Sequence, residues 1–477
     1  MKSLGRNHSQ KPPVALAFRS SKKLILTSIC VAIFTDLFLY GVIVPVIPSA
    51  IHDRAVQRWV SILLAVYGAA VLVASPFTGW LADHTSSRRV PFLIGLFALA
   101  ASTAILMAAS HIGMFIAGRI CQGVSAAVVW SVGLALLVDT ADQDETGQML
   151  GTTGISMGLG LLLAPLLGGI VFSRAGYYAV FGMCFGLLAI DIVLRLVMIE
   201  KQVAAKWIKE DDHPEVTQQQ KPEGTNSPDE ERADVGNTES SVRQVISHTR
   251  STVSTTGGAA ERSQAFLVLL SSPRVLATLW AALAVSILLT AFDAVLPIFV
   301  TTTFHWDSLG AGLIFLPIAI PSFLEPIAGW LADRYGSRWL ATGGFVCTVP
   351  LLVLLRFVTH DSTSQIVVLC VLLVGIGLVV NGIMTPVLVE LTFALRDIER
   401  DRPGLFGKKG AYAQTYSLFN VAFAGGCLLG PIIAGLIRDA SDWPTMTWSL
   451  SIIAAFASIT TALWLGPPGS GPRLWPE

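Results

Sequence analysis

The segment PFTGWLAD occupies residues 76–83, and the segment PIAGWLAD occupies residues 326–333. Five consecutive residues, GWLAD, are identical, and a proline stands three positions before them in both copies. The copies end at Asp83 and Asp333, so they lie 250 residues apart. A second pair repeats in the same way, since GxxxAPxxGG at residues 160–169 parallels GxxxGPxxAG at residues 426–435. These repeats predict two related halves that arose by duplication.

The repeated segments belong to long apolar runs. A membrane-spanning helix needs about 20 consecutive, mostly apolar residues. Six such runs fall in each half, and they cover residues 24–46, 58–82, 90–109, 112–138, 148–172 and 178–199, then 275–299, 308–332, 339–359, 364–391, 411–437 and 445–466. We therefore expect an all-α membrane protein with 12 transmembrane helices in two pseudo-symmetric six-helix bundles.

Composition excludes a soluble globular protein and gives no support to nucleic-acid binding. Of 477 residues, 53% are hydrophobic and only 13% are charged, whereas soluble domains carry about 25% charged residues. The net charge is zero, so there is no basic excess to attract a phosphate backbone. All six cysteines lie in apolar segments without metal-ligand spacing, and we expect neither a disulfide nor a metal site.

The polar segments set the predicted domains and topology. We assign residues 1–23 to an N-terminal segment, 24–199 and 266–466 to the two bundles, 200–265 to a linker and 467–477 to a tail. The linker is rich in Asp, Glu, Ser, Thr and Pro, so it lacks the apolar area needed to fold. Basic residues concentrate before the first run and in the loops after even-numbered runs, which places both termini and the linker in the cytoplasm. Lys22 and Lys23 precede a run too long for a cleavable signal.

The residues after each GWLAD copy identify a family resemblance. HTSSRR follows Asp83, and RYGSR follows Asp333. This pattern resembles the G-x-L-x-D-R-x-G-R-[RK] loop of the major facilitator superfamily, although His84 and Ser86 depart from it in the first copy. The resemblance implies a cytoplasmic charge clamp that breaks and re-forms as the halves rock. The residues expected to form it are Gly79, Asp83, Arg88, Arg89, Gly329, Asp333, Arg334 and Arg338.

Two further motifs resemble those of the same superfamily. Residues 119–123, RICQG, resemble its R-x-x-Q-G motif, and an arginine inside an apolar run is tolerated where it faces a cavity or a partner. A structural Arg119 bonded to helix carbonyls is the alternative. The segment around Pro165 resembles the antiporter signature G-x-x-x-G-P-x-x-G-G. Small residues allow close helix approach and proline permits bending, so hinge or packing roles are expected for Pro165, Gly168, Gly169, Gly430 and Pro431.

Acidic residues inside the apolar runs carry the predicted mechanism. Asp36 lies in the first run, Asp293 in the seventh and Glu390 near the cytoplasmic end of the tenth. Low dielectric disfavours the charged form of a carboxyl group, so proton uptake near neutral pH becomes possible. Such a group holds either a proton or a cationic substrate, and that competition suffices for exchange. Asp293 in a wet position and Glu390 in the membrane interface are the alternatives.

The surroundings of these acids are similar to the vesicular amine transporter branch of the drug:proton antiporters. Asp36 precedes VPVIP and Asp293 precedes LPI, as acidic residues do in that branch. Its Y-x-x-x-D-V-A-F segment has a counterpart in Tyr416–Phe423, with Asn420 in place of the acid, and Tyr67 stands where the branch has a lysine. Amine specificity is therefore not implied. We expect Asp36, Arg119, Asp293, Glu390, Asn420, Tyr40 and Tyr416 to bind protons or substrate.

The prediction is a proton-coupled carrier that exports a small, lipophilic organic compound such as a drug, toxin or secondary metabolite. A facilitator or importer of a nutrient or amine on the same fold is the alternative. A membrane enzyme or receptor lacks support, because no nucleophile pair, phosphate loop or metal cluster is present. We expect a monomer in a lipid bilayer, driven by the proton gradient without a cofactor. The polar linker and the lack of a cleavable signal are similar to those of fungal efflux carriers. This resemblance favours the plasma membrane, with a vacuolar or vesicular membrane second.

Overall fold

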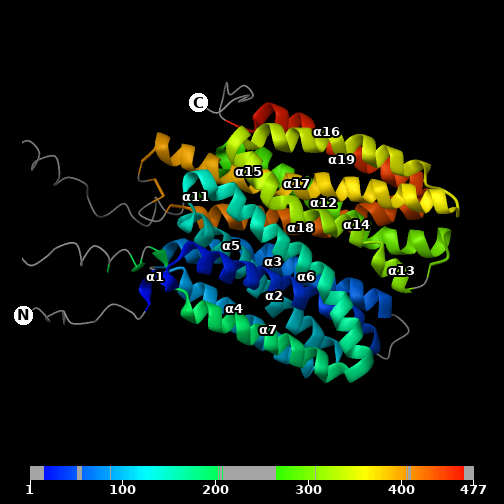
Figure 1. The fold of residues 1–477 in the computed structure, drawn as a ribbon, viewed down its shortest axis with the longest axis horizontal. Helices are drawn as coiled ribbons and strands as arrows, with labels where there is room; N and C mark the ends of the chain where they lie inside the picture. The colour runs from blue at the N-terminus through cyan, green and yellow to red at the C-terminus, as the bar shows by residue number, and fades with distance from the viewer. Residues whose placement is uncertain are drawn as a thin grey trace, which may run out of the picture.

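The computed structural model describes residues 15–50, 56–85, 87–201, 203–204, 207, 265–306, 308–403, 405–406 and 410–466. Most of the predicted linker, residues 208–264, lies outside the described residues, as does the tail. The start of the range differs from the prediction, because Glu200 is buried and accepts a hydrogen bond from the Arg89 backbone N–H, which attaches it to the first bundle. The described part is helical throughout, and 11 of its helices are long and apolar enough to cross a membrane. Figure 1 shows the helices of the two halves lying side by side with their long axes roughly parallel.

The element order matches the two predicted bundles. The first half contains α1 (Leu16–Arg19), α2 (Lys22–Ala50), α3 (Val56–His84), α4 (Arg89–Met107), α5 (Ile112–Thr140), the 3-10 helix η1 (Gln143–Glu145), α6 (Thr146–Ala175) and α7 (Tyr177–Val197). The second half contains α11 (Ala265–Ser271), α12 (Pro273–Thr303), α13 (Ser308–Leu313), α14 (Leu316–Ala319), η2 (Ile320–Leu324), α15 (Glu325–Tyr335), α16 (Ser337–Leu354), η3 (Leu355–Phe357), α17 (Thr363–Asp401), α18 (Tyr412–Ala440) and α19 (Trp443–Trp464).

The eighth apolar run departs from the sequence prediction of one continuous helix over residues 308–332. It is divided into α13, α14, η2 and α15, with a 3-10 turn in its middle. Pro317, Pro321 and Pro326 recur at intervals of four or five residues, and each proline removes one backbone donor and crowds the preceding turn. The broken run explains why 11 candidate spans are found where 12 runs were predicted.

The two copies of the Gly-Pro signature pack in equivalent ways. A Cβ atom on Gly160 of α6 would lie 3.0 Å from the Leu37 Cβ of α2, and one on Gly430 of α18 would lie 2.4 Å from the Thr290 Oγ1 of α12. Both glycines therefore let two helices of the same half approach closely. Gly168 is buried, whereas a Cβ on Gly169 would meet no other group within 4 Å. The packing role thus has a structural basis at Gly160 and Gly430.

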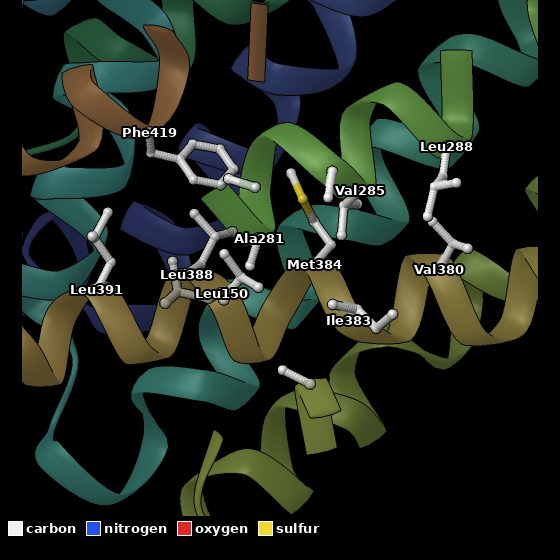
Figure 2. Close-up of a cluster of buried hydrophobic side chains, with 14 of the residues drawn as sticks. Leu150, Ala281, Val285, Leu288, Val380, Ile383, Met384, Leu388, Leu391 and Phe419 are labelled. Atoms are coloured by element: carbon white, nitrogen blue, oxygen red, sulfur yellow. The ribbon is translucent and has the colours of Figure 1, made fainter. Parts of the chain in front are cut away.

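The hydrophobic core is shared between the halves. Figure 2 shows Met384 of α17 pointing toward Ala281 and Val285 of α12, and Val380 of α17 lying beside Leu288 of α12. Leu150 of α6 and Phe419 of α18 join the same buried cluster. Because Leu150 belongs to the first half, this cluster also holds the two bundles together on one side of the molecule.

A buried ion pair joins α7 to α4 within the first half. The Arg195 guanidinium donates to both Asp191 carboxylate oxygens at 2.9 and 2.7 Å, one turn earlier on the same helix, and both side chains are fully buried. Arg195 also donates to the Phe92 carbonyl and lies 3.7 Å from the Phe92 ring centroid. The arginine therefore fastens two helices through one charged network.

We expect the substitution Arg195→Met to destabilise the first bundle strongly. It leaves the Asp191 carboxylate buried without a cation, and breaking a buried pair in this way costs about 3–5 kcal/mol. Thermal unfolding of the purified protein in detergent measures the loss. The double variant Asp191→Leu/Arg195→Met should recover most of it, since neither charge remains. A single variant that melts like the wild type would show that the pair contributes little.

Candidate functional site

The GWLAD copies end at one face of the molecule, which we call the clamp face and which the basic loops assign to the cytoplasm. At this face the Asp83 carboxylate of α3 accepts hydrogen bonds from the backbone N–H groups of Ala413 at 3.2 Å and Gln414 at 2.9 Å. These groups are among the free donors in the first turn of α18, in the other half. A carboxylate at a helix N-terminus also interacts favourably with the helix dipole. Asp83 therefore ties the first half to the second.

The second copy makes the reciprocal contact. The Asp333 carboxylate of α15 accepts from the backbone N–H of Gly147 at 2.8 Å and from that of Gln148 at 3.1 Å, at the N-terminus of α6. Each half thus places one aspartate on a helix N-terminus of the other. The two contacts together close the clamp face.

The glycine of each GWLAD copy is explained by the same contacts. A Cβ atom on Gly79 would lie 2.5 Å from the Ser417 Cβ of α18, and one on Gly329 would lie 2.0 Å from the Gly147 carbonyl oxygen of α6. Both distances are far below van der Waals contact, so a larger side chain would force the helices apart. The repeat therefore encodes two close crossings between the halves.

The basic residues of the motif make different contacts in the two copies. The Arg88 guanidinium donates to Asp83 at 2.9 Å and to Asp139 of α5 at 2.5 Å, and its side chain is buried. Arg89 and Arg338 donate to helix-end carbonyls at Leu196 and Ala462 within their own halves. Arg334 is exposed, with its guanidinium carbon 5.4 Å from the Trp330 ring centroid. The clamp predicted from sequence is therefore built by Arg88 and the two aspartates.

Asp36 lies near the middle of α2 and is fully buried. Its Oδ2 accepts a hydrogen bond from the Trp130 indole N–H of α5 at 3.3 Å, while Oδ1 is buried without a hydrogen-bond partner. The Tyr67 side chain of α3 also interacts with this carboxyl. Among the described residues, no cation lies within ion-pair distance of Asp36. The site is an uncompensated carboxyl inside the first bundle.

Arg119 is the opposite case, a fully buried guanidinium for which no carboxylate of the described residues comes within ion-pair distance. It donates to the Gln122 side chain at 3.0 Å and, at 3.4 Å, to the Tyr40 carbonyl, and its Nε has no partner. The guanidinium carbon lies 5.5 and 6.0 Å from the Tyr40 and Tyr67 ring centroids. Arg119 and Trp130 are 11 residues apart, about three turns, and so share one face of α5.

Asp293 of α12 is exposed although the residues beside it, Phe292 and Val295, are buried. It interacts electrostatically with Tyr40 of α2 and with Cys427 of α18. Tyr40 belongs to the other half, so Asp293 faces the space between the halves and not the lipid.

The structure brings Asp36, Arg119, Tyr40 and Asp293 into one electrostatic group, in which Tyr67 contacts both charged residues of the first half. Asn420 of α18 lies at the edge between the halves, where its amide donates to the Ser131 hydroxyl of α5 at 3.1 Å. We call these six residues the central group. Trp130 and Ser131 were missed by the sequence analysis, because a single Trp or Ser in an apolar run is normal.

Two predicted site residues lie elsewhere. Glu390 of α17 pairs with Arg274 at 2.5 Å, and accepts hydrogen bonds from the Ser337 hydroxyl and from the backbone N–H of Gly466 at 2.7 Å. The structure therefore places Glu390 in a network within the second bundle, not in the central group.

Tyr416 also lies outside the central group. Its hydroxyl is buried and forms a hydrogen bond with the Thr392 hydroxyl at 2.6 Å.

Two duplicated helical bundles, reciprocal contacts at one face and charged groups at the centre define a membrane transporter. The sequence model of the Major Facilitator Superfamily matches residues 26–396, and the chain belongs to that family.

Relatives agree with this assignment. The chain is 34% identical over 448 residues to the MFS-type transporter C18.02 of Schizosaccharomyces pombe, with 92% of this chain and 95% of the relative covered. It is 30% identical over 485 residues to the MFS-type transporter ppzB of Metarhizium rileyi, with 97% and 99% covered. A probable vesicular acetylcholine transporter of Danio rerio is 30% identical over 38% of each chain. The crystal structure of the human organic anion transporter MFSD10 shares the fold, with a TM-score of 0.61, 15% identity, and 94% and 100% covered.

Proposed function

We propose that this protein is a proton-coupled carrier that exports a small, lipophilic organic compound by alternating access. The observation that carries the proposal is the fully buried Asp36 carboxyl. One of its oxygens has no hydrogen-bond partner, and no cation of the described residues forms an ion pair with it. A buried charge without a partner is costly, and a neutral, protonated carboxyl avoids that cost. Asp36 is therefore suited to hold a proton in the conformation with a closed clamp face.

Asp293 supplies the second carboxyl of the proposed mechanism. Because it is exposed to the space between the halves, it can meet both solute and solvent there. Tyr40 and Tyr67, whose ring centroids are 4.7 Å apart, offer an aromatic surface beside it. Arg119 adds a cation whose Nε–H has no hydrogen-bond partner among the described residues. This N–H is available to donate to an oxygen or nitrogen atom of the solute. An aromatic wall with few charged groups favours a lipophilic compound over a sugar or an inorganic ion.

In the proposed cycle the clamp face opens, solute enters from the cytoplasm, and the central carboxyls give up their protons. The contacts of Asp83 and Asp333 then re-form and close that face. Solute leaves on the other side, where protons from outside return to the carboxyls. Protons and solute compete for the same central carboxyls, so the binding of one requires the release of the other. This competition couples proton movement to solute movement. Homology to fungal MFS-type transporters such as ppzB supports a fungal carrier, and we propose the plasma membrane as its location.

Expression in a yeast strain that lacks its own efflux carriers tests this function. We expect cells that produce the protein to accumulate less of several lipophilic fluorescent dyes, and a protonophore should remove the difference. The host with an empty vector is the control. Dye uptake that is independent of the proton gradient would favour the alternative, a facilitator or importer, over the exporter.

A further inference from the structure

Glu325 begins α15 and is buried at the seam between the halves, with 4% of its surface exposed. Its carboxyl lies directly against α6 of the other half, because a Cβ atom on Gly154 would lie 1.8 Å from the Glu325 Oε2. The Glu325 backbone is equally close, since a Cβ on Gly151 would lie 2.4 Å from its carbonyl oxygen. Gly147, Gly151 and Gly154 share one face of α6 by their spacing of four and three residues. The carboxyl is thus enclosed by a glycine stripe.

No charge compensates this carboxyl within the part of the chain that the structure describes. Its polar contact is the Thr385 hydroxyl of α17, which donates to Oε2 at 3.4 Å. The face of α6 that covers it consists of glycines, and η2 contributes no charged residue. On α17, Glu390 is held by Arg274 and Arg396 contacts Thr146 at 3.5 Å. The charged groups on α16, η1 and the end of α15 are Arg338, Asp144, Glu145, Asp333 and Arg334, and none of them interacts with Glu325.

The other half lacks this arrangement. Ser75 precedes Gly79 by four residues, just as Glu325 precedes Gly329. The Ser75 hydroxyl donates to the Val71 carbonyl of its own helix at 2.7 Å. The two crossings between the halves are therefore alike at Gly79 and Gly329 and at the aspartates that follow, but only the crossing of α15 with α6 has a carboxyl one turn before the glycine. An acidic residue is not needed to build such a crossing.

From these contacts we propose that Glu325 is a proton-binding site that links closure of the clamp face to cytoplasmic pH. Closing the seam removes the carboxyl from water and encloses it among glycines. Because burial disfavours the charged form, the carboxyl is protonated and neutral in the closed state. When α15 and α6 separate, the side chain meets the cytoplasmic solution and releases its proton. Glu325 lies eight residues from Asp333, about 12 Å along the helix, so it acts inside the contact that Asp333 makes at the surface.

The sign of the pH effect follows from linkage. The closed state holds the Glu325 proton more tightly than the open state, so acidification favours closure and alkaline cytoplasm favours opening. One coupled proton changes the ratio of closed to open protein by at most about tenfold per pH unit. The proton is taken from and returned to the same side, so it regulates the cycle without adding to the exchange at Asp36 and Asp293. The inference rests on alternating access within the proposed function, but not on the solute or on exchange.

Electron–electron distance measurements on the full chain test the proposal. Spin labels at Lys23→Cys on α2 and Arg400→Cys on α17 report the separation of the halves at the clamp face, in protein whose six native cysteines are replaced by alanine. Both positions are exposed and lie outside the contacts described above. In the wild-type background, we expect the short-distance population to grow severalfold as pH falls from 8 to 5.5. Glu325→Gln should keep the short distance throughout that range.

Three further variants make the result decisive. Glu325→Asp keeps a titratable group and should keep the pH response, which shows that the fold tolerates substitution there. Asp397→Asn removes a carboxylate of α17 whose side chain is 44% exposed, and should behave like the wild type. Asp36→Asn should keep the pH response of the distances, because the proposed proton at Glu325 is separate from the exchange proposed at Asp36. Dye efflux by the same variant tests the proposed function by itself. A Glu325→Gln protein whose distances change with pH as much as those of the wild type would overturn the proposal.

Discussion

Replacing Asp36 by asparagine should abolish dye efflux driven by a pH gradient. Asparagine keeps the shape of the side chain but cannot bind and release a proton, so the one carboxyl buried between α2 and α5 is lost. Efflux from cells that produce the variant should fall to the level of the empty host. Exchange of dye across vesicles without a gradient should continue, because the solute pathway and the two crossings at the clamp face are unchanged.

Controls separate the loss of a proton site from a loss of fold. Asp361→Asn neutralises an exposed acid in the loop before α17 and should leave efflux intact. Asp36→Glu restores a carboxyl and should recover part of the activity. If Asp36→Asn cells export dye at the wild-type rate under the same gradient, then Asp36 does not carry the coupled proton.

Replacing Gly329 by alanine should also stop transport, for a steric reason. The added Cβ would lie 2.0 Å from the Gly147 carbonyl oxygen, which belongs to the backbone of the other half. Overpacking of this kind costs about 1–3 kcal/mol, which lowers the ratio of closed to open clamp face by roughly 5- to 150-fold. The cycle needs that conformation, so dye efflux should fall in proportion.

Thermal stability distinguishes this effect from misfolding. Alanine is a better helix former than glycine by roughly 0.5–1 kcal/mol, so the bundle itself should melt no lower than the wild type. Gly343→Ala is the matched control, because a Cβ on Gly343 of α16 would meet no other group within 4 Å. Full efflux by the Gly329→Ala variant would mean that the close crossing of α15 and α6 is not part of the cycle.

Much of the architecture could be predicted from the sequence because a membrane imposes a simple rule on it. Apolar runs of about 20 residues must be helices there, and the GWLAD repeat placed them in two halves. The eighth run was the exception, since the spacing of Pro317, Pro321 and Pro326 outweighed its apolar composition. The family and the fold followed from the same residues, as the comparisons show.

The site was harder to predict because it depends on which helices face each other. The sequence identified Asp36 and Asp293 as acids inside apolar runs, but it gave Glu390 the same status. Only the fold shows that Glu390 has Arg274 as a cationic partner from another helix, whereas no ion pair of the described residues includes Asp36. The role of Glu325 could not be predicted from the sequence for the same reason. Its meaning depends on the glycines of α6, which lie far away in sequence.

The central claim is that the buried carboxyls exchange protons for solute between two rocking halves. Proton movement into proteoliposomes that contain a pH-sensitive dye tests it most directly, with an outward gradient of the lipophilic probe that the protein exports best from cells. The account predicts that the probe gradient drives protons inward, that the flux stops with Asp36→Asn, and that Asp361→Asn leaves it unchanged. Probe movement at full rate with no accompanying proton flux in the wild-type protein would contradict the account.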